Sequence, residues 1–360
     1  MKKFAGIFIL IAVIIAVVVF SKQHGTIGSG TATADLTTVT GYVGGEKLNL
    51  LKDPDVVSIL RDKYKLDVRY DRRGSLEMAR DKELSGKDYL WPSSQVALEV
   101  FKDVHGKPLE SELLFNSPIV LYSWANVTDA LVKQNIVSKS QNTYYVSDFP
   151  KLISLVNKGA TWASIGLPDL YGKVAIYSTD PTQSNSGNMF AGLLANVVNG
   201  SSVVNEATLP GVLPTVKKFF DNQGFMETSS DVIFTQYLNK GVGDKPIIVG
   251  YESQLIEFSI SNQSAFARRN NDVRMLYPKP TVWSSHPLIA LTENGRKLIA
   301  AMQDPEIQRL SWENHGFRSA TGATNDTSTL GVKGVPDNLQ TIVPMPSARV
   351  MERIINALGG

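Results

Sequence analysis

The sequence predicts an α/β protein in which strands and amphipathic helices alternate in two successive sets. The first set covers residues 37–124 and the second covers residues 127–358. In the first set, three expected strands end at Val43, Tyr70 and Trp91, and each is followed by a polar turn and a helical pattern. This alternation predicts mixed, mostly parallel sheets with helices on their faces. Ligands of such folds bind at the carboxyl ends of the strands, where these turns lie.

The elements of the first set follow from hydrophobic periodicity and from punctuating residues. Asp53-Pro54 has the form of a helix N-cap followed by proline at the first helical position. Ser93-Ser94 are expected to cap a helix that continues to Val104. The expected strands cover residues 38–43, 66–70, 88–91 and 117–124.

The second set follows the same logic with longer helices. Helices are expected at 127–134, 151–158, 185–197, 213–222, 229–240, 293–302 and 306–312, and a last one at 347–358. Strands are expected at 174–177, 246–250 and 274–277, and an apolar region follows at 282–291. The segment 320–338 has the composition of a loop.

The chain is organised around the stretch 175–191. An apolar strand is expected to break at Asp180-Pro181, because a residue before proline avoids the helical region. The small polar residues Ser184–Gly187 then lead into an apolar helix. The start of a helix has unpaired N–H groups and a partial positive charge, so this turn could seat an oxyanion. The alternative is that Ser184 or Ser186 serves only as an N-cap.

Composition excludes several classes of protein. The 360 residues include 36 basic and 34 acidic side chains and no cysteine. Without a basic excess the chain offers no field for nucleic acid, and without cysteine it has no disulfide, cysteine-ligated metal or cysteine nucleophile. The four histidines form no zinc-binding pattern, and no phosphate-binding glycine loop or serine-hydrolase elbow is present. We therefore expect no cofactor, no metal and no enzymatic activity.

The N-terminus is the clearest targeting signal. Lys2 and Lys3 precede an uninterrupted apolar run from Phe4 to Phe20. We interpret residues 1–22 as a signal anchor or transmembrane helix, followed by a flexible linker at 23–36. The alternative is a cleaved signal peptide, for which Ala32-Thr33-Ala34 has the form of a processing site. In both cases the body of the protein is expected outside the cytoplasm, in the periplasm or at the cell surface.

The order of these features resembles a known family. An exported α/β body contains Gly44-Gly45-Glu46, Trp91-Pro-Ser-Ser94, Thr179-Asp-Pro-Thr-Gln-Ser-Asn-Ser-Gly187, Gly250-Tyr-Glu-Ser253 and Gly316-Phe-Arg318. It is similar to the bacterial extracytoplasmic substrate-binding proteins of ABC transporters, the two-lobed type II kind that includes phosphate, sulfate and molybdate binders. The resemblance covers most of residues 37–320, and 179–187 is its most specific part.

The resemblance implies two Rossmann-like lobes joined by two crossing hinge strands, with a ligand enclosed between them. The crossings are expected near 117–124 and 274–287. Lobe I then comprises residues 37–122 and 275–360, and lobe II comprises residues 123–274. The ligand-binding residues implied by matching positions are Gly45, Glu46, Ser93, Ser94, Ser184, Asn185, Ser186, Gly187, Tyr251 and Glu252.

Two of these positions leave the class of ligand open. A buried carboxylate at Glu46 or Glu252 repels a fully ionised oxyanion. It could instead accept a hydrogen bond from a protonated oxyanion, or bind an amine or a metal. Arg72, Arg73 and Arg318 could each reach the ligand or lie on the surface.

The function that these features predict is extracytoplasmic solute binding. The protein would capture a small polar ligand, an oxyanion by this interpretation, and deliver it to ABC permease subunits or a sensor. One alternative is an exported hydrolase or transferase acting on a phosphorylated small molecule, with Glu46, Asp180 or Glu252 as base. Another is a surface module that binds a second protein.

Overall fold

The computed structural model describes residues 36–322, 325–339 and 341–359. The expected anchor at 1–22 and all but the last residue of the expected linker lie outside these ranges. Within the described ranges, no helix is long and apolar enough to cross a membrane. The body, residues 37–360, forms one unit by its internal contacts.

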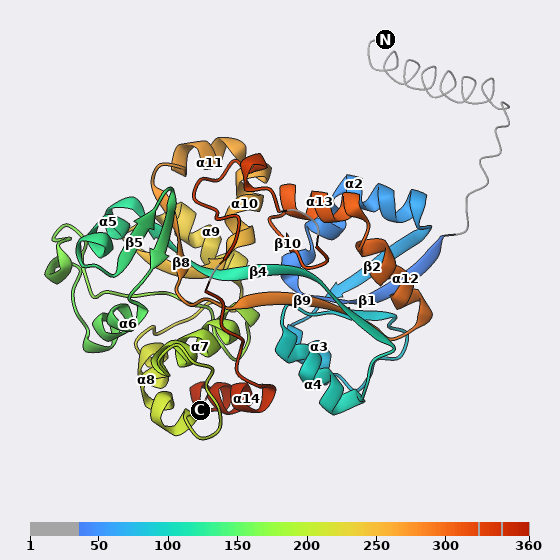
Figure 1. Ribbon diagram of the computed structural model, residues 1–360, viewed down its shortest axis with the longest axis horizontal. Helices are drawn as coiled ribbons and strands as arrows, with labels where there is room; N and C mark the ends of the chain where they lie inside the picture. The colour runs from blue at the N-terminus through green and yellow to red at the C-terminus, as the bar shows by residue number, and fades with distance from the viewer. Residues whose placement is uncertain (1–35, 323–324, 340, 360) are drawn as a thin grey trace, which may run out of the picture. The chain divides into compact units, whose positions relative to one another are not determined.

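The strands form two groups that share the long strand β4, Glu110–Trp124 (Figure 1). Sheet A has the order β2-β1-β3-β9-β4, with β10 also pairing β4. Its other strands are β1 (Thr37–Val43), β2 (Leu66–Arg72), β3 (Tyr89–Trp91), β9 (Trp283–Ala290) and β10 (Arg318–Ser319). Sheet B has the order β7-β4-β8-β6-β5. Its other strands are β5 (Val137–Ser140), β6 (Thr143–Val146), β7 (Ile247–Tyr251) and β8 (Val273–Pro278).

The predicted α/β class with two lobes and crossing strands is confirmed. β1 pairs in parallel with β2 and β3, so Val43, Arg72 and Trp91 lie side by side at one edge of sheet A. The antiparallel pairs involve β4 or β9, except for the hairpin of β5 and β6. β4 pairs with β9 up to Pro118 and with β7 from Ile119, so the strand passes from sheet A to sheet B between these two residues.

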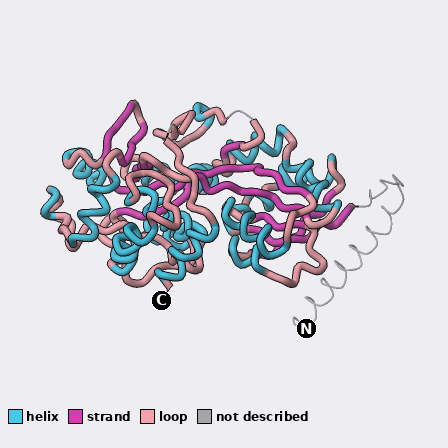
Figure 2. Tube along the Cα trace, turned by 60° about the horizontal axis from the view of Figure 1, so that its bottom comes forward, coloured by secondary structure: helices cyan, strands magenta, loops and turns pink. Residues whose placement is uncertain are grey.

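Helices cover both groups of strands (Figure 2). Those that pack mainly on sheet A are α3 (Ser75–Arg80), α4 (Gln95–His105) and α12 (Glu293–Met302). Those around sheet B are α5 (Ala125–Lys133), α6 (Phe149–Lys158), α7 (Asn185–Val198), α8 (Leu209–Asp221), α9 (Ser230–Lys240) and α10 (Glu252–Ser261). The remaining helices are α2 (Pro54–Ser58), α11 (Gln263–Arg269), α13 (Pro305–Glu313) and α14 (Ala348–Leu358). Short turns of helix lie at η1 (Gly45–Lys47), η2 (Leu50–Lys52), η3 (Ile59–Lys63), η4 (Ala163–Ile165) and η5 (Thr327–Thr329).

The core follows the alternation of side chains along the strands. Val39 and Val43 of β1 face one apolar cluster with α12, whereas Tyr42 faces another with α4. A single larger cluster fills the space around sheet B. Because successive strand residues point to opposite faces, sheet A needs helices on both sides, as the parallel pattern predicts.

Three features differ from expectation. Residues 174–177 form no regular strand, and only Tyr177 pairs, through an isolated bridge to Ile248 of β7. The hairpin of β5 and β6 was not predicted, because it carries polar, exposed positions and has no hydrophobic run. Helix α14, which the sequence-based division places in lobe I, contacts α7 and α8 as well as α4.

Candidate functional site

The candidate site is a cleft of about 270 Å³ that lies between the two groups of elements. One wall is formed by the turns after β1 and β2, and the other by the beginnings of α7 and α9. A neighbouring groove of about 360 Å³ shares six lining residues with it, so the two are parts of one opening. The shared residues are Gly74, Ser75, Glu77, Gln183, Ser184 and Asn185. The size of the combined opening suits a small molecule.

The N-termini of two long helices open onto the cleft. The N-cap residues are Ser184 of α7 and Ser229 of α9, and both line it. Neither serine uses its hydroxyl to cap its own helix. Since the first N–H groups of a helix have no partner within the helix, the cleft presents hydrogen-bond donors and a positive potential that attract an anion.

Arg72 adds a formal positive charge to the opposite wall. The side chain is exposed, and it forms no hydrogen bond or ion pair with any described residue. Its guanidinium lies against Gly45, where a Cβ atom on the glycine would come within 2.9 Å of Arg72 Nε. Arg73, by contrast, pairs with Asp81 and Glu77 and lies over the ring of Tyr42. Of the two neighbouring arginines, Arg72 is thus the one available to a ligand.

Besides Glu77, which pairs with Arg73, two carboxylates face the same space. Asp231, the second residue of α9, lines the cleft and accepts a 3.4 Å hydrogen bond from Gln254. Surrounding protein atoms displace water from Asp231 and Glu46 adds negative charge nearby, so the pKa of Asp231 is raised. Glu46 accepts a hydrogen bond from the Ser93 hydroxyl at 2.7 Å. The site is therefore mixed in charge.

Behind Glu46 lies a buried polar network. Lys47 Nζ donates to Ser93 Oγ at 2.7 Å and lies 3.1 Å from His286 Nδ1. Burial lowers the pKa of Lys47 to about 8, although Glu46 opposes this shift. Burial, with the charge of Lys47, also holds the pKa of His286 well below its usual value. The network fixes the Ser93 hydroxyl between an ammonium and a carboxylate, so Ser93 positions Glu46 and does not itself line the cleft.

Asn185 connects the two walls. Its Nδ2 donates to the main-chain oxygen of Ser93 at 2.9 Å and to the Tyr251 hydroxyl at 3.1 Å. Tyr251 is buried, and burial first and Glu46 second raise its pKa well above the usual value. Tyr251 is therefore a neutral hydrogen-bonding group behind the cleft, and Asn185 is the residue that reaches both sides.

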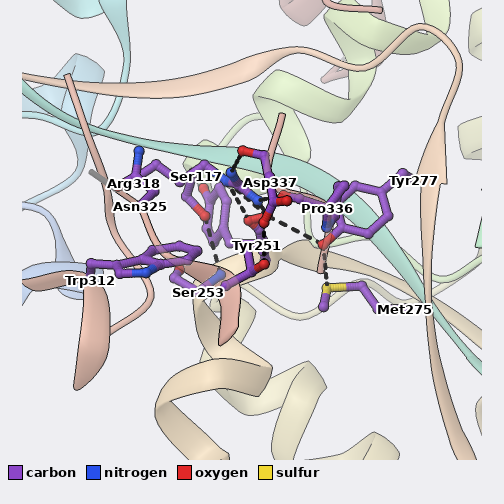
Figure 3. A network of polar contacts seen from close by, with 12 residues as sticks. Ser117, Tyr251, Ser253, Met275, Tyr277, Trp312, Arg318, Asn325, Pro336 and Asp337 are labelled. Atoms are coloured by element: carbon purple, nitrogen blue, oxygen red, sulfur yellow. Dashed lines mark hydrogen bonds and ion pairs between the residues drawn. The ribbon is translucent and has the colours of Figure 1, made fainter. Parts of the chain in front are cut away.

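Glu252 lies outside the cleft lining. The carboxylate is fully buried and accepts from Arg318 Nε at 2.7 Å and from Arg318 Nη2 at 2.9 Å. Tyr277 contributes a third donor at 3.3 Å, and Arg318 also donates to the main-chain oxygens of Pro336 and Asp337 (Figure 3). A carboxylate that is satisfied in this way has little capacity left for a ligand.

The remaining predicted residues have local structural roles. Ser94 caps α4 by accepting from Val96 N. Ser186 is buried and exchanges hydrogen bonds with Thr179 and Ser184. At Gly187 a side chain would meet the Thr179 main-chain oxygen at 2.2 Å, so this glycine permits a close approach of the backbone. Of the ten predicted residues, the cleft brings together Gly45, Glu46, Ser184 and Asn185.

The sequence-based prediction expected a helix at 229–240 but did not assign its beginning to the site. Thr228, Ser229, Ser230 and Asp231 supply much of the second wall. Their pattern, small hydroxyl residues and an aspartate around the N-cap and first turn of a helix, is an N-terminal signal equal to that at Ser184. Asp180, one of the bases considered for an enzyme, accepts from Thr182 and Gln183 within its own turn.

Comparison with solved structures shows the fold. The chain is similar to the sulfate-binding protein from Mycobacterium tuberculosis, with a TM-score of 0.54 and 12% identity over 90% of this chain and 96% of that one. A Trichodesmium protein in complex with iron and citrate is similar with a TM-score of 0.56 and 13% identity, over 90% of this chain and 98% of that one. The substrate-binding protein of an ABC transporter from Agrobacterium tumefaciens is similar with a TM-score of 0.53 and 13% identity, over 91% of this chain and 96% of that one. No family model and no curated protein sequence matches the chain.

Proposed function

The body has the two-lobed fold of extracytoplasmic solute-binding proteins, and we propose that this is also its function. The protein captures a small polar ligand that bears an oxyanion in the cleft between its lobes, and it delivers the ligand to a membrane permease. The observation that carries this proposal is the convergence on one cleft of the N-termini of α7 and α9 and of Arg72, which pairs with no described residue.

Binding requires that the lobes move. We propose that they pivot where β4 passes from sheet A to sheet B at Pro118–Ile119 and where residues 279–282 link β8 to β9. Lobe I is then built on sheet A and lobe II on sheet B. The contact of Asn185 with Ser93 belongs to the closed arrangement. We further propose that residues 1–22 export the protein and anchor the body outside the cytoplasm.

Binding without turnover separates this function from an exported enzyme. Glu252 is held by Arg318, and Asp180 is engaged in its own turn, which leaves Glu46 as the remaining base of those considered. Incubation of the purified full-length protein with phosphate esters should release no phosphate. Turnover that Glu46→Gln abolishes would favour the enzyme.

The direct test is ligand capture by the purified full-length protein. Native mass spectrometry should reveal a co-purified small molecule, and a melting assay with phosphate, sulfate, molybdate and amine ligands should identify others. A ligand at 100 times its dissociation constant adds about 2.7 kcal/mol of stability. Arg72→Met should weaken capture, whereas Arg80→Met, at the end of α3 and paired with Glu352 at the surface, should not. Absence of any captured solute would contradict the proposal.

A further inference from the structure

The charged side chains around the cleft restrict the class of ligand further than the fold does. The lining contains Arg72, Arg73, Glu46, Glu77 and Asp231. Arg73 and Glu77 lie within 3.5 Å of each other, and Arg73 also pairs with Asp81, so its single positive charge is shared between two carboxylates and is not available to a ligand. One guanidinium, that of Arg72, and two carboxylates, those of Glu46 and Asp231, remain for a ligand.

These three groups share the cleft without pairing. Among the described residues, Arg72 has no hydrogen-bond or ion-pair partner, and Asp231 has only the long contact from Gln254. Glu46 accepts from the neutral hydroxyl of Ser93 through Oε2, and its other oxygen has no partner in the described chain. A guanidinium and a carboxylate that were needed only for mutual neutralisation would form a direct pair. Because they are separate, the guanidinium and the carboxylates can each interact with a ligand that lies between them.

A simple dianion does not suit this set of groups. Sulfate would gain from Arg72 and the helix N-termini, but it has no proton to donate to Asp231 or Glu46 and would be repelled by both. A metal ion is also disfavoured, because the described residues contain no group of three acidic, histidine or cysteine side chains that could hold one. Hydrogen phosphate has one proton to donate and could satisfy only one of the two carboxylates. An organic molecule with charges of both signs would satisfy all three groups.

We propose that the ligand is a small zwitterion that carries an oxyanion and an ammonium group. This proposal rests on the solute-binding function above. The oxyanion, a phosphonate, phosphate or carboxylate, lies against Arg72 and the N-termini of α7 and α9. The ammonium group donates to Asp231 and to the free oxygen of Glu46. Ser93 and Lys47 hold Glu46 in place from behind.

Matched pairs of probes test the ammonium requirement on the full-length protein. 2-Aminoethylphosphonate is compared with ethylphosphonate, and β-alanine with propionate, by isothermal titration calorimetry. Inorganic sulfate and phosphate are titrated in parallel. In at least one pair the ammonium-bearing member should bind about tenfold more tightly or better, as expected for charge-assisted hydrogen bonds in a partly closed site. The two pairs also distinguish a phosphonate from a carboxylate as the oxyanion.

Two variants locate the charges. Asp231→Asn should weaken the ammonium-bearing probe about tenfold and leave its partner unchanged or slightly tighter. Arg72→Met should weaken both members of the pair. Asp221→Asn, an exposed carboxylate at the end of α8 outside the cleft, serves as the matched control and should change neither. Circular dichroism verifies that each variant is folded.

The outcomes separate this inference from the function on which it rests. If sulfate, phosphate or the probes without ammonium bind as tightly as their partners, or if the co-purified solute contains no amine, the zwitterion proposal is overturned while solute binding stands. The same holds if Asp231→Asn leaves discrimination within the pair intact. If no solute of any class binds, both proposals fail.

Discussion

The side-chain amide of Asn185 lies 2.9 Å from the main-chain oxygen of Ser93, and this hydrogen bond joins the first residue of α7 to the turn after β3. The same amide reaches the Tyr251 hydroxyl, and Ser284 Oγ donates to the same oxygen of Ser93. One residue thereby connects the turn at the beginning of α7, in the second wall, to a polar network that begins at Lys47 in the first.

Asn185→Ala should weaken ligand capture by about fivefold, because it removes the neutral hydrogen bond that joins α7 to the turn after β3, which contributes about 1 kcal/mol. The unliganded variant should also have a larger radius of gyration by small-angle X-ray scattering. Asn294→Ala, on α12 and outside the cleft, is the control. An unchanged affinity and an unchanged radius would show that this bond does not hold the lobes together.

Ser229→Ala and Ser94→Ala distinguish a binding hydroxyl from a capping one. Both serines stand at the N-cap of a helix, but Ser94 accepts from Val96 N whereas Ser229 makes no such bond. Ser94→Ala should lower the free energy of unfolding by about 1 kcal/mol and leave affinity intact. Ser229→Ala should lower affinity several-fold with little change in stability. The reverse pattern, measured by urea denaturation and calorimetry, would place the ligand elsewhere.

Lys47 should make the stability of the protein rise with pH above 8. Burial lowers its pKa in the folded state to about 8 from 10.5, so between these values the unfolded chain binds the proton that the folded chain has lost. The free energy of unfolding should therefore increase by roughly 2 kcal/mol between pH 8 and pH 10 from this group.

Lys47→Met provides the comparison, because the buried tyrosines contribute their own pH dependence at the upper end of this range. The difference in unfolding free energy between wild type and Lys47→Met should grow in favour of wild type as pH rises. A difference that stays constant from pH 7.5 to pH 10 would show that Lys47 keeps an ordinary pKa.

His315 should give the opposite pH dependence. Its Nδ1 lies 2.7 Å from Glu257 of α10 and its Nε2 3.0 Å from Asp53, the N-cap of α2. Burial alone would lower the pKa of His315, but the hydrogen bonds and charges of these carboxylates outweigh it and raise the pKa. The stabilisation is then fully present below the unfolded value of about 6.5 and is lost as pH rises through the folded value.

His315→Gln should therefore destabilise the protein more at pH 6 than at pH 9. Chemical denaturation at the two values measures the difference. His105→Gln, at the end of α4 and without a hydrogen bond to a carboxylate among the described residues, is the control. An equal loss at both pH values would indicate that His315 is neutral in the folded protein.

Glu252 and Arg318 should behave as a structural pair. Glu252→Gln leaves the Arg318 guanidinium buried without its counter-ion and should cost about 3–5 kcal/mol of unfolding free energy. The double variant Glu252→Leu with Arg318→Met should recover much of that loss. In any variant that folds, ligand affinity should be unchanged. A selective loss of ligand affinity with normal stability would indicate that Glu252 contacts the ligand.

Local patterns in the chain predicted most of the alternation of strands and helices, apart from residues 174–177 and the β5–β6 hairpin, and the edge of the sheet at which the cleft lies. Hydrophobic periodicity and helix N-caps are local signals, and the turns after Val43 and Arg72 and before α7 follow from them. The turn at Ser184, predicted to seat an anion, lines the cleft. The start of α9 carries a signal of the same kind, so it too was predictable from the sequence.

Long-range contacts, by contrast, determine which polar residues remain available to a ligand. Glu46 and Glu252 look alike in the sequence, since each follows a strand. Glu252 meets Arg318, 66 residues further along the chain, whereas the only hydrogen-bond partner of Glu46 among the described residues is the Ser93 hydroxyl. Local patterns place a side chain at the end of a strand, but its partners come from distant segments that the crossing strands bring together. Those partners neutralise one carboxylate and leave the other, with Asp231 and Arg72, facing the cleft.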